Sequence, residues 1–218
     1  MRFRKLLSLL CLTSLCACSL SKNMKTHQKN KYVVINDEGQ SEMIRQILKT
    51  QAEAYSFPLS KEDLESIGVL EQAFDNEEKI AGLAAPQIGI KKQAIIFHAP
   101  QEIAKWRADL TEVVPKTIWL NPHYEGIGDE HTEDYEGCFS VNDLAGEVPR
   151  FRKVKYEAYL IDGTKVQGIA EGYFARVIQH EVDHIRGILF IDKISEERLF
   201  SIKEYYRMRD AKIDAAGK

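Results

Sequence analysis

The stretch Gln179-His180-Glu181-Val182-Asp183-His184 decides the fold and the chemistry that this 218-residue sequence predicts. Residues four apart on an α-helix lie on one face, so His180 and His184 are placed to bind one cation with Glu181 beside them. This is the outline of a hydrolytic metal site in which the glutamate serves as a general base. On this stretch alone, a structural helix that carries two histidines near acidic residues remains an alternative.

Two other stretches bear on that choice. Glu136-Gly137-Cys138-Phe139-Ser140 holds the only cysteine outside the N-terminal segment, and a lone cysteine is either a buried small apolar residue or a ligand. Gly82-Leu83-Ala84-Ala85-Pro86-Gln87-Ile88-Gly89 is a run of small residues that lets a substrate backbone lie close. Taken alone, this run is a turn or a helix end. The three stretches together, in this order, favour the metal site.

These stretches resemble the motifs of the peptide deformylases, metal hydrolases that remove the formyl group from N-formylmethionyl peptides and leave formate and a free N-terminal amine. That family carries G-x-G-L-A-A-x-Q, then E-G-C-(L/F)-S, then Q-H-E-x-D-H. The resemblance covers about residues 82–193 and includes Trp119-Leu120-Asn121-Pro122 and Gly146-Glu147-Val148-Pro149-Arg150. It implies activity on formylmethionyl peptides or nascent chains.

The resemblance also implies the metal ligands. Cys138, His180 and His184 form a three-ligand set that leaves a fourth position to water, as catalytic sites do. Glu181 then takes the proton of the water and delivers it to the departing amine. One thiolate and two imidazoles suit zinc by ligand type, whereas the family works best with ferrous iron. We therefore expect Fe²⁺, with Zn²⁺, Ni²⁺ or Co²⁺ as substitutes.

Further roles follow from the resemblance alone. The backbone N–H of Phe139 and the side-chain amide of Gln87 are expected to stabilise the negative charge that develops on the formyl oxygen. An ion pair between Arg150 and Asp183 is expected to support the histidine helix. The residues expected to contact substrate are Ile80, Gly82, Leu83 and Glu136.

The sequence departs from the family at three places. Ile80 stands where the first motif has glycine, which adds a branched side chain where backbone passes close to substrate. Val141-Asn142-Asp143 replaces the proline-containing continuation that usually follows the second motif. These departures predict a reshaped substrate entrance and a gain in turnover for Ile80→Gly. The front of the chain also lacks the family's usual Pro-Asp-containing opening, so the sequence does not predict which element covers the site.

The first residues carry an export pattern. Arg2, Arg4 and Lys5 precede an apolar stretch at residues 6–15, and Leu15-Cys16-Ala17-Cys18 resembles the lipobox of bacterial lipoproteins. The apolar stretch is too short to span a membrane and fits a signal peptide. We expect a signal peptide over residues 1–17, lipidation of Cys18 and a membrane-anchored lipoprotein. Translation from Met24, which gives a cytoplasmic protein, is the alternative.

Composition predicts one globular domain after this segment. Residues 18–40 are expected to be a tether, and residues 41–218 the catalytic domain. A hydrophobic content of 44% can bury a sizeable core. Loss of residues 1–17 removes three basic residues and changes the net charge from −3 to −6, which predicts no nucleic-acid-binding surface. Cys138 is the only cysteine in the domain, so no intramolecular disulfide can form there.

The pattern of apolar residues predicts an α+β fold, with antiparallel strands around a central metal-binding helix and further helices at the N- and C-termini. Two helices are expected in front. One covers residues 41–55, and the other begins at the capping box Ser60-Lys61-Glu62-Asp63. Four apolar residues of the second helix are expected to face the core: Leu64, Ile67, Leu70 and Phe74.

Strands are expected over residues 93–98 and 117–121, the second stopped by Pro122. A hairpin is expected over residues 154–170, with its turn at Asp162-Gly163. The histidine helix should end at Gly187, followed by a returning strand over residues 188–191. A final helix is expected from Ser195.

Three functions of different classes are consistent with these features. The first is an active deformylase. The second is an H-E-x-x-H metallopeptidase, against which the cysteine ligand and the three ordered motifs argue. The third is a metal-site protein of the same fold that binds formyl peptides with low or no turnover. Intact Glu181 and Gln87 argue against this third function, because a protein without catalysis has no chemical need for the base.

Overall fold

The structure is a computed structural model that describes residues 31–105 and 107–216. The predicted signal peptide, Cys18 and Met24 therefore lie outside the described residues. From Tyr32 onward the chain packs as one unit. Val33 and Val34 are buried in it, so residues 32–40 of the expected tether belong to the domain.

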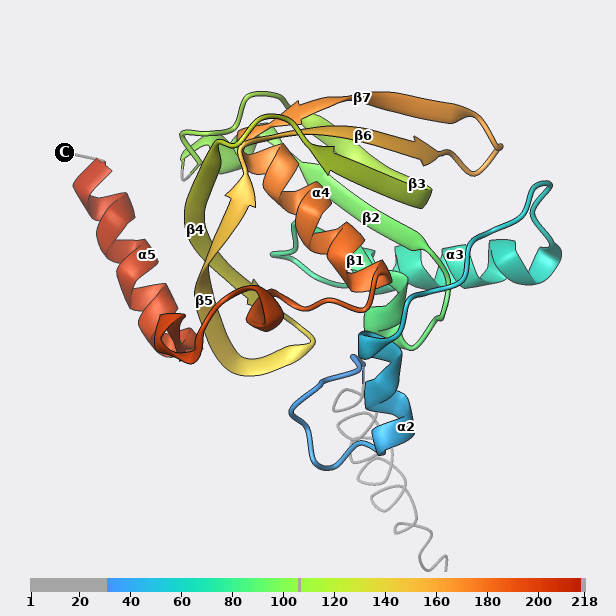
Figure 1. The fold of residues 1–218 in the computed structure, drawn as a ribbon, viewed down its shortest axis with the longest axis horizontal. Helices are drawn as coiled ribbons and strands as arrows, with labels where there is room; N and C mark the ends of the chain where they lie inside the picture. Colours follow the sequence, from blue (N-terminus) through green and yellow to red (C-terminus); the bar gives the residue numbers. More distant parts are fainter. Residues whose placement is uncertain (1–30, 106, 217–218) are drawn as a thin grey trace, which may run out of the picture. The chain divides into compact units, whose positions relative to one another are not determined.

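One sheet has five antiparallel strands in the order β1-β2-β3-β6-β7 (Figure 1). The predicted hairpin is confirmed, because β6 pairs with β7 and Gly163 turns between them with φ of 84°. The strands are β1 (Gly82–Ala84), β2 (Ala94–Ala99), β3 (Val114–Gly126), β6 (Lys153–Tyr159) and β7 (Lys165–Glu171).

Strand β3 continues through Pro122, where the sequence predicts its end. The register shifts between Leu120 and His123, and Asn121 adopts a left-handed φ of 49° at this irregularity. Asn121 is held there because its side chain bonds to both backbone polar groups of Tyr55. A bulge of this kind removes the need for a ladder N–H, so proline is tolerated within the strand.

The second sheet has three strands in the order β4-β5-β8. They are β4 (His131–Cys138), β5 (Val141–Phe151) and β8 (Leu199–Ser201). The sequence does not predict this sheet, because the acidic residues of β4 hide its alternation. Pairing with the adjacent strand β5 decides that β4 is a strand.

Helix α4 (Gly172–Ile185) lies at the centre and contacts strands of both sheets (Figure 1). It is buried along most of its length, as its apolar residues predict. Gly187 follows the helix with φ of 78°, and its N–H donates to the carbonyl of His184 at 3.1 Å. The N–H of Ile188 donates to the carbonyl of Asp183 at 2.9 Å, which completes a Schellman cap and confirms the predicted helix end.

The chain after this cap differs from the prediction. Residues 188–191 do not form a strand, because a 3-10 helix, η5 (Phe190–Lys193), begins there and Asp192 caps the N–H of Leu189 at 2.7 Å. The final helix does not begin at Ser195 either. A short helix η6 (Glu196–Arg198) and strand β8 come first, and α5 (Ile202–Ala216) follows, because β8 is held by pairing with β5.

The expected helix over residues 41–55 is shorter than predicted. It consists of α2 (Glu42–Arg45) and the 3-10 helix η2 (Gln46–Lys49). The chain then becomes extended, because the N–H of Ala52 donates to the carbonyl of Ile185 at 2.8 Å. Tertiary hydrogen bonds override the helical spacing of the apolar residues here.

Helix α3 (Lys61–Asp75) begins with the predicted capping box of Ser60 and Asp63. Ile67, Leu70 and Phe74 are buried as expected, whereas Leu64 is 48% exposed, so its predicted inward position is wrong. Two short helices, η3 (Ala85–Ile88) and η4 (Gln101–Lys105), complete the elements. In the part of the chain that the structure describes, no helix is both long and apolar enough to cross a membrane.

Candidate active site

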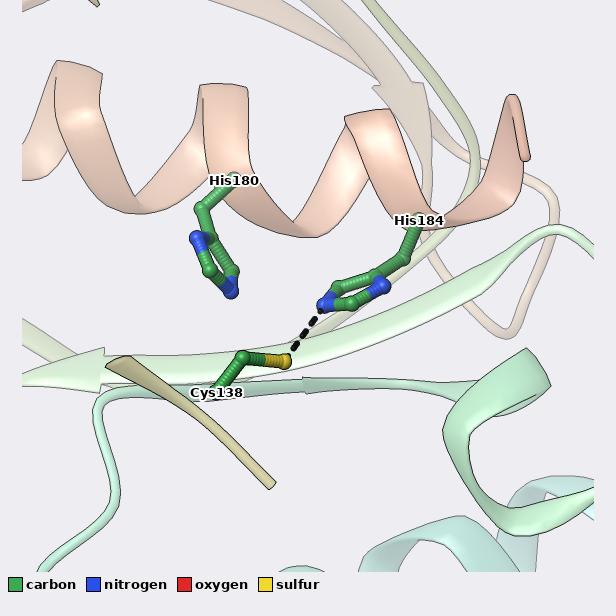
Figure 2. Close-up of side chains that lie close together, drawn as sticks. All are labelled: Cys138, His180 and His184. Carbon is green, nitrogen blue, oxygen red and sulfur yellow. Dashed lines mark hydrogen bonds between the residues drawn. The ribbon is translucent and has the colours of Figure 1, made fainter. Parts of the chain in front are cut away.

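The three expected ligands converge between β4 and α4. Cys138 ends β4, His180 and His184 lie one turn apart on α4, and their side chains point toward one another (Figure 2). One ligand atom from each residue lies within 4.8 Å of the others, and Cys138 Sγ is 3.2 Å from His184 Nε2. Sulfur and nitrogen atoms bound to one tetrahedral zinc lie ~3.5 Å apart. The cluster therefore fits a single divalent cation.

The protonation of the imidazoles suits this use. His180 Nδ1 lies 2.8 Å from Glu136 Oε2, which leaves Nε2 for a cation. Burial lowers the pKa of His184 well below its usual value, with help from neighbouring His180 and Arg150, so this imidazole is neutral. Burial also lowers the pKa of His180, but hydrogen bonds with Cys138 and Glu136 outweigh it and raise the pKa. A cation on Nε2 would displace that extra proton.

Glu136 anchors a buried charge network behind His180. Its carboxylate accepts two bonds from Arg150, each at 2.9 Å, and one from Arg176 Nη1 at 2.7 Å. Burial raises the pKa of Glu136, but Arg150 and His180 together hold the pKa well below its usual range. The carboxylate is thus ionised and orients the ligand His180. The substrate contact expected for Glu136 stays a prediction.

Asp183 occupies the other side of Arg150. Arg150 forms with it the ion pair that the resemblance implies. The hydroxyl of Tyr124 donates to Asp183 at 2.9 Å, and Lys193 Nζ lies 3.3 Å from the same carboxylate. Burial and the charge of Asp183 together raise the pKa of Tyr124, which therefore stays a neutral donor. These contacts fix the helix turn between the two histidines.

Glu181 is buried beside the ligands and belongs to the same helix turn. Its Oε2 has no hydrogen-bond partner among the described residues. Burial raises its pKa from 4.5 to about 7, and a nearby cation would lower it again. A Cβ on Gly82 would meet Glu181 Oε1 at 2.5 Å. A side chain at position 82 would therefore have to displace the carboxylate of Glu181.

The two expected oxyanion donors both lie next to the sulfur ligand. Gln87, in η3, accepts the N–H of Ala84 at 2.8 Å and donates from Nε2 to Cys138 Sγ at 3.3 Å. The N–H of Ser140 lies 3.4 Å from the same sulfur. Phe139 lies between Cys138 and Ser140 in the chain, and its ring stacks on the ring of Tyr32. The donation expected from the Phe139 N–H stays a prediction.

Comparison with known proteins identifies the family. A family model for polypeptide deformylase matches residues 19–199. The chain belongs to this family. It is 47% identical over 190 residues to peptide deformylase 2 of Rickettsia conorii, a match that covers 86% of this chain and 94% of that protein.

Solved deformylase structures share the fold. The class I type b peptide deformylase of Acinetobacter baumannii with bound Met-Ala-Ser has a TM-score of 0.61 and 28% identity, over 75% of this chain and 99% of that one. Its actinonin-bound form has a TM-score of 0.59 and 28% identity, and the match covers 76% of this chain and 97% of that one. These matches confirm the predicted α+β fold. The chain is accordingly a metal-dependent hydrolase that removes formyl groups from peptides.

Two residues expected to contact substrate in this deformylase have side chains in the core. Leu83 is fully buried, so only its backbone in β1 is placed to reach a peptide. Ile80 packs in an apolar cluster with Leu70 and Phe74 of α3, and its carbonyl bonds to His98 Nε2 at 2.7 Å. The expectation that the Ile80 side chain narrows the entrance is therefore corrected, because burial of apolar surface draws the side chain inward.

The structure adds three residues to the site that the sequence analysis does not name. Arg176 and Tyr124 complete the network behind the ligands, and Tyr32 packs on Phe139. Only Arg176 leaves a signal in the sequence. It interrupts the apolar run of α4 between Phe174 and Val177, and a charge at a buried helix position requires a partner.

Proposed function

We propose that this deformylase acts on N-formylmethionyl peptides, including nascent chains, with Fe²⁺ held by Cys138, His180 and His184. One observation carries the proposal: the three ligand atoms lie within 4.8 Å of one another, and the buried carboxylate of Glu181 lies on the same helix turn. A thiolate and two imidazoles with one open position form the donor set of a catalytic site. When bound, a divalent cation there supplies Lewis acidity that makes water nucleophilic at neutral pH.

Glu181 moves the proton. It takes the proton from the attacking water, and later gives that proton to the amine nitrogen as the C–N bond of the formamide breaks. Its Oε2 is available for this transfer, since no described residue bonds to it. The space left by Gly82 lets the carboxylate sit beside the ligands without a clash. The products are formate and a peptide with a free N-terminus.

Gln87 and Phe139 stabilise the developing charge. As the water oxygen bonds to the formyl carbon, negative charge grows on the formyl oxygen. Gln87 Nε2 and the backbone N–H of Phe139 donate to it. Gln87 is preoriented, because its Oε1 is already held by the N–H of Ala84 at 2.8 Å. Loss of one such donor typically costs ~10²-fold in rate.

Strand β1 supplies a surface for the peptide. It is the edge strand of the five-stranded sheet, paired with β2 on one side. The N–H of His98 bonds to the carbonyl of Ala81, so by antiparallel alternation the backbone groups of Gly82 point away from β2. An extended peptide that adds along this edge would bring its N-terminal formyl group to Glu181.

Anaerobic turnover tests the function. The iron-loaded protein should release formate from a formyl-Met tripeptide, and Glu181→Ala with equal iron content should not. Unformylated peptides should remain intact, which separates a deformylase from a metallopeptidase. A folded, iron-loaded wild type that releases no formate would support a binding protein instead.

The metal has its own test. Reconstitution of the metal-free protein with Fe²⁺ under anaerobic conditions should give a higher kcat/KM than reconstitution with Zn²⁺ at the same occupancy. Ni²⁺ and Co²⁺ should also restore turnover. Iron activity no greater than zinc activity would contradict the assignment of Fe²⁺.

We further propose that the enzyme is a membrane-anchored lipoprotein acylated at Cys18. The support is the order of basic residues, short apolar stretch and lipobox-like sequence at residues 2–18. A labelled fatty acid should enter the wild-type protein in cells and should not enter Cys18→Ser. Absence of label in the wild type would favour translation from Met24 and a cytoplasmic enzyme.

A further inference from the structure

Residues 32–36, here called the strap, link two segments that are far apart in the sequence. The N–H of Val33 donates to the carbonyl of Gln87 at 2.7 Å. The N–H of Ile35 donates to the carbonyl of Ser140 at 2.9 Å. Gln87 and the residue before Ser140 are the proposed oxyanion donors, so the strap bonds to both of the segments that carry them.

An amide pair fixes one end of the strap. Asn36 Nδ2 donates to the carbonyl of Asn142 at 3.0 Å, and the N–H of Asn142 donates back to Asn36 Oδ1 at 3.0 Å. Asn142 belongs to the Val141-Asn142-Asp143 segment, where the chain departs from its family's usual proline-containing continuation. The two bonds are reciprocal, so they set both the distance and the register between the strap and the loop after Cys138.

An aromatic stack fixes the other end. The ring of Tyr32 lies on the ring of Phe139, with centroids 4.7 Å apart and planes at 8°. The hydroxyl of Tyr32 donates to Glu77 Oε1 at 2.8 Å, which ties the ring to the end of α3. Phe139 is thereby held from outside the loop that contains it.

We propose that the strap is the positioning element of the oxyanion-binding donors, with Tyr32 and Asn36 as positioning residues. This inference rests on the proposed function, which assigns those donors to Gln87 and Phe139. Oxyanion donors must lie within 2.7–3.1 Å of the charge that they stabilise, and small misplacements cost rate steeply. The segments that carry Gln87 and Phe139 keep their donors at these distances because the strap bonds to both segments.

The kinetic signature follows from what the donors do. They act on the oxyanion, whose charge develops in the transition state and is absent from the bound substrate, so a loosened strap should lower kcat and leave KM nearly unchanged. It should also leave the iron content unchanged, because the side-chain contacts that the Tyr32 and Asn36 variants lose are with Phe139, Glu77 and Asn142, none of which is an expected ligand. A residue that only supported folding would lower stability without this pattern.

Four full-length variants test the strap. Tyr32→Ala removes the stack and the Glu77 bond, whereas Tyr32→Phe keeps the stack. Asn36→Ala removes the amide pair at an exposed position, so it does not threaten folding. Asn76→Ala, at an exposed position after α3, is the matched control. With equal iron content, kcat should fall about tenfold in Tyr32→Ala and severalfold in Asn36→Ala, and should stay within about twofold in the other two variants.

A second measurement does not depend on turnover. In the metal-free protein, amide hydrogen exchange over residues 137–142 should be faster in Tyr32→Ala and Asn36→Ala than in the wild type or Asn76→Ala. Unchanged kcat and unchanged exchange in both strap variants would overturn the inference. A fall in kcat/KM that is explained by lost iron or by a higher KM would overturn it too. Inactivity of the wild type would instead overturn the proposed function, and the exchange data would still decide whether the strap holds the loop.

Discussion

Burial raises the pKa of Glu181, the residue proposed to transfer the proton, from 4.5 to about 7. A carboxyl whose pKa is higher in the folded state than in the unfolded state costs no stability below pH 4.5, where both states are protonated. As the pH rises from 4.5 to 7 the unfolded state ionises first, and stability is lost. Above pH 7 the cost reaches about 3 kcal/mol.

We therefore predict that Glu181→Gln stabilises the metal-free protein in a pH-dependent way. The gain in the free energy of unfolding should be small at pH 4.5 and about 3 kcal/mol at pH 8. Urea unfolding of both metal-free proteins at a series of pH values measures it. A difference that does not change with pH would show that the carboxyl titrates normally.

At the same scale, the absence of a side chain at Gly82 leaves room for the carboxylate of Glu181. Gly82→Ala places a Cβ 2.5 Å from the carboxylate, so the base must move. We predict that kcat falls by about tenfold or more while iron content is kept. The control is Gly68→Ala on α3, where a new Cβ meets nothing within 4 Å. It should keep full activity and raise stability by about 0.5–1 kcal/mol. Full activity of Gly82→Ala would contradict this geometry.

At the scale of elements, Arg176 joins α4 to the second sheet. It donates to Glu136 at 2.7 Å, to the Val148 carbonyl at 2.9 Å and to the Thr132 carbonyl at 2.7 Å. Glu136 in turn orients His180. Arg176 therefore joins Arg150, which bonds to Glu136 and Asp183, in holding α4 against β4 and β5, the elements that carry and surround the expected metal ligands.

We predict that Arg176→Met weakens metal binding by about 10- to 100-fold, because Glu136 loses one of its two guanidinium partners and orients His180 less firmly. Titration of the metal-free protein with Co²⁺, followed by its thiolate absorption, measures this affinity. Arg152→Met, at a surface ion pair with Glu130, is the matched control and should bind Co²⁺ as the wild type does. Equal affinities for both variants would exclude a role for Arg176 in the site.

At the scale of the whole molecule, Ile80 belongs to the apolar core between α3 and the five-stranded sheet. Ile80→Gly should lower the free energy of unfolding by about 3 kcal/mol or more, because it leaves a cavity and adds backbone freedom. The kcat/KM of the folded, iron-loaded fraction should not rise. Denaturant unfolding and active-site titration check the two parts of this prediction, and a gain in kcat/KM without loss of stability would restore the position of Ile80 at the entrance.

Local spacing predicted much of the site and some of the elements. His180 and His184 share a helix face because the helix repeat places residues four apart together, and Gly187 ends that helix because glycine adopts the left-handed conformation of the cap. The Ser60 capping box and the Asp162-Gly163 hairpin are local in the same sense. These correct predictions all concern residues within one or two turns of each other, although the equally local cap of Leu189 by Asp192 was missed.

Tertiary structure decided the rest. Strand β4 exists because β5 pairs with it, and the chain after Lys49 is extended because its backbone bonds to Ile185 and Asn121. Arg176 finds Glu136 forty positions away, and the strap reaches Ser140 across more than a hundred residues. Such contacts leave no periodic trace in the sequence. They form because buried polar groups must be paired, and only the folded chain determines which partner is within reach.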